Sequence, residues 1–178
     1  DGAYTEHMDQ AWRPDRQALS EIVSHLCQYS LYAYEDELRQ GYITIEGGHR
    51  VGIVGQAVQE SPGSIRTIKH ISAINIRIAH QILGAATPVL PYIYRRGSMR
   101  NTLIVSPPGC GKTTMLRDLV RQISGGSAYG PARTVGVVDE RSEIAGCYMG
   151  QPQNDLGPRS DVLDACPKAL GMMMLLRS

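Results

Sequence analysis

The chain has 178 residues, of which 42% are hydrophobic and 20% are charged, as in an ordinary soluble protein of one or two domains. Its net charge of +1 gives no bulk electrostatic argument for a nucleic-acid or anionic-membrane partner. The four widely spaced cysteines form no C-x-x-C pair and indicate reduced thiols in a cytosolic protein, and the longest apolar run, residues 172–176, is too short to span a bilayer.

The N-terminal part of the sequence predicts a small α+β domain. His7-Met8 resembles a cloning remnant, so residues 1–8 are set aside. Residues 15–40 carry apolar side chains at helical spacing, and Gly41 is the expected stop. The stretch "YITIEGGHRVGIV" (42–54) then predicts a hairpin that turns at its two adjacent glycines.

A further strand is expected within residues 65–78, and a linker should follow it. Gly84, Pro88 and Pro91 interrupt regular structure in the next stretch. We therefore place a domain boundary near residues 84–100. The first domain with its linker is predicted to cover residues 9–98.

The second predicted domain, residues 99–178, has the order of a nucleotide-binding α/β fold. A buried strand, an amphipathic helix, a second apolar strand and a final helix are expected at residues 102–106, 112–124, 134–140 and 167–177. Strand, helix and strand in this order form a βαβ unit of a parallel sheet.

A Gly-rich loop, "SPPGCGKTT" (106–114), joins the first of these strands to the helix. Its first residue is serine where the phosphate-loop pattern G-x-x-x-x-G-K-[ST] has glycine, but a small residue can also close that turn. Backbone N–H groups of such a loop bind the β-phosphate, while lysine contacts the β- and γ-phosphates and the next hydroxyl binds Mg²⁺. The sequence therefore predicts an ATP·Mg²⁺ site made by Ser106, Pro107, Pro108, Gly109, Cys110, Gly111, Lys112, Thr113 and Thr114.

Two carboxylates follow the second apolar strand at the sheet edge where ligands bind. We expect Asp139 to act as a metal ligand together with Thr113, and Glu140 to position or activate water. This is the first strand after the loop helix, where many such ATPases carry their catalytic glutamate. A solvated strand end with a salt-bridged glutamate is the alternative.

Several motifs together resemble the stage III sporulation protein AA family, which is similar to the ATPases of type II and type IV secretion systems. They are "EGGHRVGIVG", "SAINIRIAH", "SPPGCGKTT", "VDERSEIAG" and "GQPQNDLGPRSDVLDACPKALGMMMLLRS". The resemblance covers the chain from about residue 15. It implies a RecA-like P-loop ATPase core, preceded by the small α+β domain.

The resemblance also implies a biological setting. A homo-hexamer in the mother-cell cytoplasm would hydrolyse ATP to energise a transenvelope channel between mother cell and forespore. It would associate with the membrane through a membrane-protein partner. The family's Walker B strand should follow "LLRS", yet the sequence ends at Ser178, so we expect a truncated core and an inactive isolated chain.

The resemblance further implies roles for arginines of the N-terminal domain. Secretion ATPases close this domain over the nucleotide, and Arg77 and Arg50 occupy the matching motifs. An arginine there stabilises transition-state charge, worth about 10³–10⁵ in rate in other systems. Each could instead be a structural surface residue. Arg159 is a further candidate, for a contact between subunits.

Two other functions fit the same core. One is a nucleic-acid-dependent RecA-like ATPase, against which the net charge of +1 and the lack of a basic stripe with interleaved aromatic residues count. The other is a non-catalytic nucleotide-gated scaffold. Stimulation of ATP hydrolysis by nucleic acid distinguishes the first alternative from a secretion-type motor.

Overall fold

The computed structural model describes residues 7, 9, 11 and 13–177, without the side chains of Leu31 and Tyr32. Most of the residues set aside as a cloning remnant, 1–6 and Met8, lie outside the described part. The fold is mixed α/β, and the chain divides into two compact units, residues 1–43 with 50–77 and residues 44–49 with 78–178. The chain therefore passes between the units three times.

The helices of the first unit are shorter than the sequence pattern predicts. They are α1 (Arg16–Leu26), the 3-10 turn η1 (Leu31–Tyr34) and α2 (Glu35–Arg39). A continuous helix over 15–40 is wrong, because Gln28 and Tyr29 adopt φ angles of 49° and 61°, which a right-handed helix excludes. Gly41 is the expected stop, with φ of 80° and its N–H bonded to the Leu38 carbonyl at 3.0 Å.

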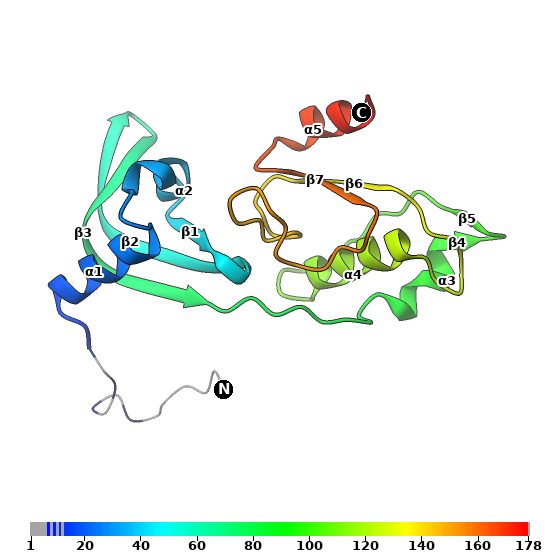
Figure 1. Cartoon of the computed structure of the whole chain (residues 1–178), viewed down its shortest axis with the longest axis horizontal. Helices are drawn as coiled ribbons and strands as arrows, with labels where there is room; N and C mark the ends of the chain where they lie inside the picture. The colour runs from blue at the N-terminus through cyan, green and yellow to red at the C-terminus, as the bar shows by residue number, and fades with distance from the viewer. Residues whose placement is uncertain (1–6, 8, 10, 12, 178) are drawn as a thin grey trace. The chain divides into compact units, whose positions relative to one another are not determined.

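A three-stranded sheet, in the order β1-β2-β3, supports these helices. Its strands are β1 (Tyr42–Ile45), β2 (His49–Ser61) and β3 (Ser64–Arg77). The predicted hairpin is confirmed: the 3-10 turn η2 (Glu46–Gly48) joins β1 to β2, with φ of 84° and 72° at its two glycines. The strand expected within 65–78 is β3, against which α1 and α2 both pack (Figure 1).

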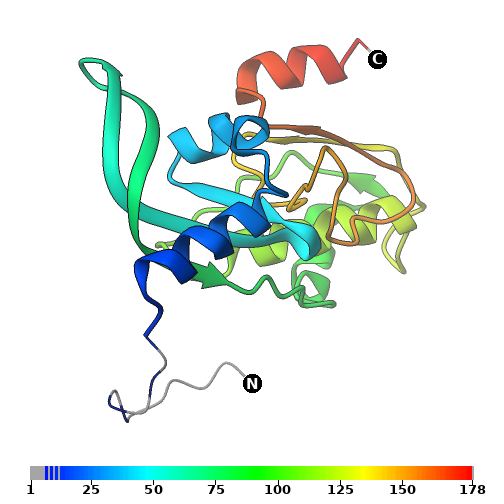
Figure 2. The ribbon, with the colours of Figure 1, turned by 60° about the vertical axis from the view of Figure 1, so that its left-hand side comes forward.

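A bulge bends the β2–β3 hairpin near its middle. Val54 pairs with Ala73 and Gln56 with Lys69, so three residues of β3 lie opposite Gly55 alone. A Cβ atom at Gly55 would lie 2.7 Å from the Lys69 carbonyl oxygen, closer than any side chain tolerates. Only glycine fits here, and beyond the bulge the hairpin projects past the helices (Figure 2).

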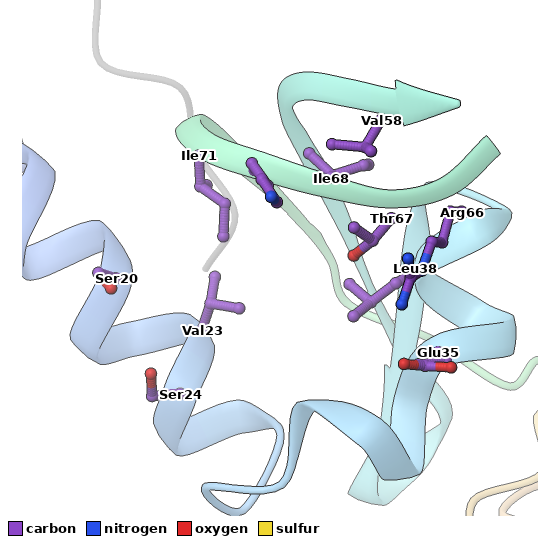
Figure 3. Close-up of a pocket in the computed structure, with 11 residues that line it drawn as sticks. Ser20, Val23, Ser24, Glu35, Leu38, Val58, Arg66, Thr67, Ile68 and Ile71 are labelled. Atoms are coloured by element: carbon purple, nitrogen blue, oxygen red, sulfur yellow. The ribbon is translucent and has the colours of Figure 1, made fainter. Parts of the chain in front are cut away.

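A pocket of about 420 Å³ lies between α1, α2 and this hairpin. Val23 and Ile71 face one another across it, with Leu38 and Ile68 beside them (Figure 3). Glu35, Arg66 and Lys69 also line it. None of the residues predicted to bind nucleotide belongs to this pocket.

The second unit is built on a pair of parallel strands. Its elements are η3 (Thr87–Val89), α3 (Leu90–Ile93), β4 (Tyr94–Arg95), β5 (Ser98–Met99), α4 (Lys112–Gly125), β6 (Val135–Asp139), β7 (Ser160–Asp164) and α5 (Lys168–Leu175). β6 and β7 run parallel in register from Val135 opposite Ser160. Helices α4 and α5 lie on opposite faces of this pair (Figures 1 and 2), the layering of an open α/β sheet.

The strand predicted at residues 102–106 does not form. Leu103 and Val105 are 86% and 79% exposed, and the segment pairs with no other strand in the described part of the chain. Only Ile104 packs, against the cluster around Leu90. An apolar run becomes a strand only where a neighbour satisfies its N–H and C=O groups, and here β6 pairs with β7 instead.

The division into units also places the predicted linker differently. Residues 84–98 belong to the second unit, whereas the sequence analysis assigned them to the first domain. Ala86, Leu90, Ile93 and Tyr94 are buried in one cluster with Leu119 of α4. The breaker residues therefore shape a packed connection to α4, because their apolar neighbours are buried against it.

A buried carboxylate fixes this connection to α4. Asp118 is 0% exposed, and its oxygens accept hydrogen bonds from the Ala86 N–H at 2.8 Å, Gln122 Nε2 at 2.7 Å and Arg121 Nη2 at 2.7 Å. Burial alone would raise the pKa of Asp118, but these hydrogen bonds outweigh it and hold the pKa below its ordinary value.

We expect Asp118→Asn to lower the free energy of unfolding by about 3 kcal/mol at pH 7, because the half-buried Arg121 loses its charged partner at a fully buried position. A depressed folded pKa gives stability that is complete above the unfolded pKa, about 4, and is lost as the pH falls through the folded value. Urea unfolding should therefore show a difference in the free energy of unfolding between the two proteins that becomes smaller below pH 4. An equal difference at pH 3 and pH 7 contradicts this account.

Candidate nucleotide-binding site

The Gly-rich loop has the backbone conformation that its sequence predicts. Gly109 and Gly111 adopt φ angles of 76° and 78°, which side-chain-bearing residues rarely take. A Cβ atom at either position would meet no atom within 4 Å, so conformation and not crowding selects glycine. Helix α4 begins at Lys112, directly after the second glycine, and its first-turn N–H groups and dipole favour an anion.

Lys112 folds across this loop. Its Nζ atom donates to the carbonyl oxygens of Ser106 and Pro107, both at 2.7 Å, and to Ser106 Oγ at 3.3 Å. The ammonium group therefore lies over the first turn of the loop. Serine at the first position is compatible with the loop, because both its carbonyl and its hydroxyl contact Lys112.

The other predicted nucleotide-binding residues divide into two groups. Pro107, Pro108 and Cys110 are exposed on the loop. Thr113 and Thr114 are half-buried in the first turn of α4. A hydroxyl at the position of Thr113 has the place and the oxygen chemistry for a Mg²⁺ ligand next to bound phosphates.

Asp139 has a different environment from the one expected of a metal ligand. It is 3% exposed at the end of β6, and its oxygens accept backbone N–H bonds from Glu143 at 2.9 Å, Ile144 at 2.8 Å and Ala145 at 2.8 Å. These bonds tie the loop after β6 to the strand, so the geometry supports a structural role for Asp139, and its role as a metal ligand stays a prediction.

We expect Asp139→Asn to loosen the loop after β6 and to cost about 1–3 kcal/mol of stability, because an amide nitrogen cannot accept these N–H bonds. The loss should be the same with and without Mg²⁺. Thermal unfolding in EDTA and in millimolar Mg²⁺ measures it. A destabilisation that appears only with Mg²⁺ and nucleotide would instead identify Asp139 as a metal ligand.

Glu140 follows Asp139 and contacts a different part of the chain. Its Oε2 atom accepts a hydrogen bond from Lys168 Nζ at 2.6 Å, at the start of α5. This hydrogen bond and the lysine charge lower the pKa of Glu140. The carboxylate is thus ionised at neutral pH and exposed, as a water-positioning group would have to be. Its contact with Lys168 equally fits the alternative, a salt-bridged glutamate at a strand end.

Arg50 and Arg77 lie together in the first unit. They are cross-strand partners on β2 and β3, and both line a pocket of about 240 Å³ with Tyr42 and Asn75. The Arg50 guanidinium stacks 4.5 Å from the centre of the Tyr42 ring. Like charges at paired positions repel, so an anion that bridges both guanidinium groups would relieve this repulsion.

Two arginines of the second unit have structural contacts. Arg159, predicted to contact another subunit, donates from its backbone N–H to Ser124 Oγ at 2.6 Å and from Nη1 to the Ser124 carbonyl at 3.3 Å. Arg117 of α4 donates to three carbonyls. The sequence analysis did not single out Arg117, although a charged residue beside the apolar face of a helix is a signal for a buried polar contact.

Two further findings concern metal clusters and membrane-spanning helices among the described residues. Within them, no three His, Cys, Asp or Glu side chains gather closely enough to hold a metal ion by themselves. Among the helices of residues 13–177, none combines the length and apolar character that a bilayer span requires.

The described part of the second unit is a mixed α/β arrangement: a parallel strand pair lies between two helices, and one of these helices begins at Lys112 directly after a glycine loop. Residues 9–178 match the family described as "Sporulation stage III, protein AA". The chain is also 54% identical over 157 residues to "Stage III sporulation protein AA" of Bacillus subtilis (strain 168), a match that covers 88% of the chain and 50% of that protein. No solved structure matches the chain.

The chain therefore belongs to the Sporulation stage III, protein AA family, which confirms the family resemblance read from its motifs and links it to sporulation. It spans about half the length of the curated relative that it matches.

Proposed function

We propose that this protein is an ATPase of the secretion-motor type that works in sporulation. The observation that carries the proposal is the loop: two glycines at positive φ lead directly into α4, and Lys112 lies over the loop. This geometry is suited to a nucleoside triphosphate, because the first N–H groups of a helix and the ammonium group of the residue that begins it both favour phosphate charge.

Each residue of the proposed site has a distinct task. The backbone from Gly109 to Thr113 would hold the β-phosphate, and Lys112 would exchange its carbonyl contacts for phosphate oxygens. Thr113 would hold Mg²⁺, which neutralises phosphate charge when bound. Glu140 would orient the attacking water after leaving Lys168.

The arginine pair would supply the remaining positive charge. Arg77 and Arg50 present two guanidinium groups on one face of the β2–β3 hairpin. We propose that closure of the N-terminal domain brings them to the γ-phosphate, where they stabilise transition-state charge. The RecA-like core, the homo-hexamer, the mother-cell cytoplasmic location and the membrane-protein partner of a transenvelope channel are parts of the same proposal, supported by the family resemblance.

Glu140→Gln in the full-length protein tests the hydrolytic part of this proposal. The amide keeps the shape of the side chain but cannot act as a base, so ATP should still bind while hydrolysis falls by about 10²–10⁴-fold. Quench-flow measurement of bound ATP and ADP should show trapped ATP. Hydrolysis at the parental rate would mean that Glu140 is only the salt-bridge partner of Lys168.

A further inference from the structure

Arg117 joins three parts of the second unit through a single guanidinium group. It lies on α4, five residues after Lys112. Its Nε donates to the Ile144 carbonyl at 2.7 Å, Nη2 to the Glu143 carbonyl at 2.8 Å and Nη1 to the His80 carbonyl at 3.3 Å. The three acceptor residues lie 26 to 37 residues from Arg117 in the sequence. These bonds therefore do not arise from local helix geometry.

Arg117 makes these hydrogen bonds in a partly buried environment within the second unit. The residue is half-buried, and burial lowers its pKa, an effect that Asp139 partly opposes. Partial burial of a guanidinium group is unfavourable unless its donors are paired. Three of its five N–H donors have carbonyl partners in a planar arrangement that lysine cannot reproduce.

The carbonyls that Arg117 binds belong to segments next to both proposed catalytic groups. Glu143 lies three residues after Glu140, in the loop that Asp139 fixes to β6. His80 lies three residues after Arg77, where the chain has just entered the second unit. Arg117 itself is on the helix that begins at Lys112.

The segment after Arg77 is held at three consecutive residues. The Ala79 N–H donates to His49 Nδ1 at 3.0 Å, and His80 is bound by Arg117. The Gln81 side chain accepts from the Asp155 N–H at 2.9 Å and donates to the Asp155 carbonyl at 2.6 Å. Residues 79–81 are therefore a fixed strap on the second unit, and its central bond comes from the phosphate-loop helix.

We propose that Arg117 is a positioning residue that transmits movement of α4 to the loop after Glu140 and to the strap after Arg77. It contacts no reacting group. Nucleotide binding acts on the N-terminal turn of α4, and a planar fork with three fixed acceptors carries a small shift of that helix to both backbones at once. This inference rests on the proposed ATPase function and names a residue that couples its parts.

The test uses Arg117→Lys in the full-length protein, which keeps the charge but loses the three-way geometry. We expect kcat for ATP hydrolysis to fall roughly 10- to 100-fold, because small misplacements of catalytic groups cost that much. The dissociation constant for ATP should change less than about threefold, since Lys112 and the loop remain. Arg133→Lys, at an exposed position between α4 and β6, is the control and should keep the parental kcat.

Hydrogen–deuterium exchange gives a readout that does not depend on hydrolysis. In Arg117→Lys, amides of residues 79–83 and 143–147 should both exchange about fivefold faster, whereas Arg133→Lys should leave both unchanged. If the parental protein fails to hydrolyse ATP, the ATPase proposal fails, and exchange still decides whether Arg117 couples the two segments. Three results for Arg117→Lys would overturn the proposal: faster amide exchange in only one of the two segments, faster exchange in neither, or an unchanged kcat where the parental protein is active.

Discussion

Lys112→Ala should weaken ATP binding to the full-length protein by about 10- to 100-fold, the loss expected for charge-assisted hydrogen bonds to phosphate. The fold should survive, because the side-chain hydrogen bonds of Lys112 are to carbonyl and hydroxyl groups of its own loop. Isothermal calorimetry with ATP measures the binding, and circular dichroism checks the fold.

A lysine outside the loop provides the control for this experiment. Lys69 is exposed on β3, so Lys69→Ala removes the same charge and should leave the affinity for ATP unchanged. Equal affinities of Lys112→Ala and the parental protein would show that the loop does not hold the phosphates.

Arg77→Ala should lower kcat by about 10³-fold or more while the affinity for ATP changes little. The proposed interaction of Arg77 is strongest with the charge that develops on the γ-phosphate in the transition state. Steady-state kinetics and an ATP titration on the full-length protein separate these two quantities. Arg66→Ala, on the same strand, is the matched control and should behave as the parental protein.

The pattern of losses identifies what Arg77 does. A modest and equal loss in kcat and in ATP affinity would mean that Arg77 only binds the nucleotide. Unchanged kinetics would mean that the arginine pair on β2 and β3 has a structural or unrelated role.

Local sequence patterns predicted those elements whose cause is local. The loop glycines, the start of α4 at Lys112 and the hairpin turn at Gly47-Gly48 each follow from a backbone conformation that few residues allow. The final helix, α5, likewise forms within the range predicted for it. These elements do not require knowledge of distant partners.

Elements that depend on partners were predicted less well. Residues 102–106 have the apolar character of a buried strand but no hydrogen-bonding neighbour in the described structure. The pairing of β6 with β7 was missed because the polar stretch before residue 160 gave no strand signal. The break after α1 comes from positive φ at Gln28 and Tyr29. Neither glutamine nor tyrosine is a residue type that predicts positive φ.

The polar contacts of the site show the same limit. Asp139 was expected to bind metal because it ends a strand, and that reasoning did not predict that three following N–H groups donate to its oxygens. An aspartate four to six residues before those groups is a pattern that could have indicated a loop cap. Arg117 and Asp118 lie beside the apolar face of α4, but their partners at residues 80, 86 and 143–144 appear only in the fold.

Phosphate release from ATP by the full-length protein is the most direct test of the central claim. The account predicts Mg²⁺-dependent release that saturates with ATP and is lost in Lys112→Ala, while Lys69→Ala retains it. A folded parental protein that releases no phosphate, or equal release by parental protein and Lys112→Ala, would contradict the assignment of this phosphate loop to an ATPase.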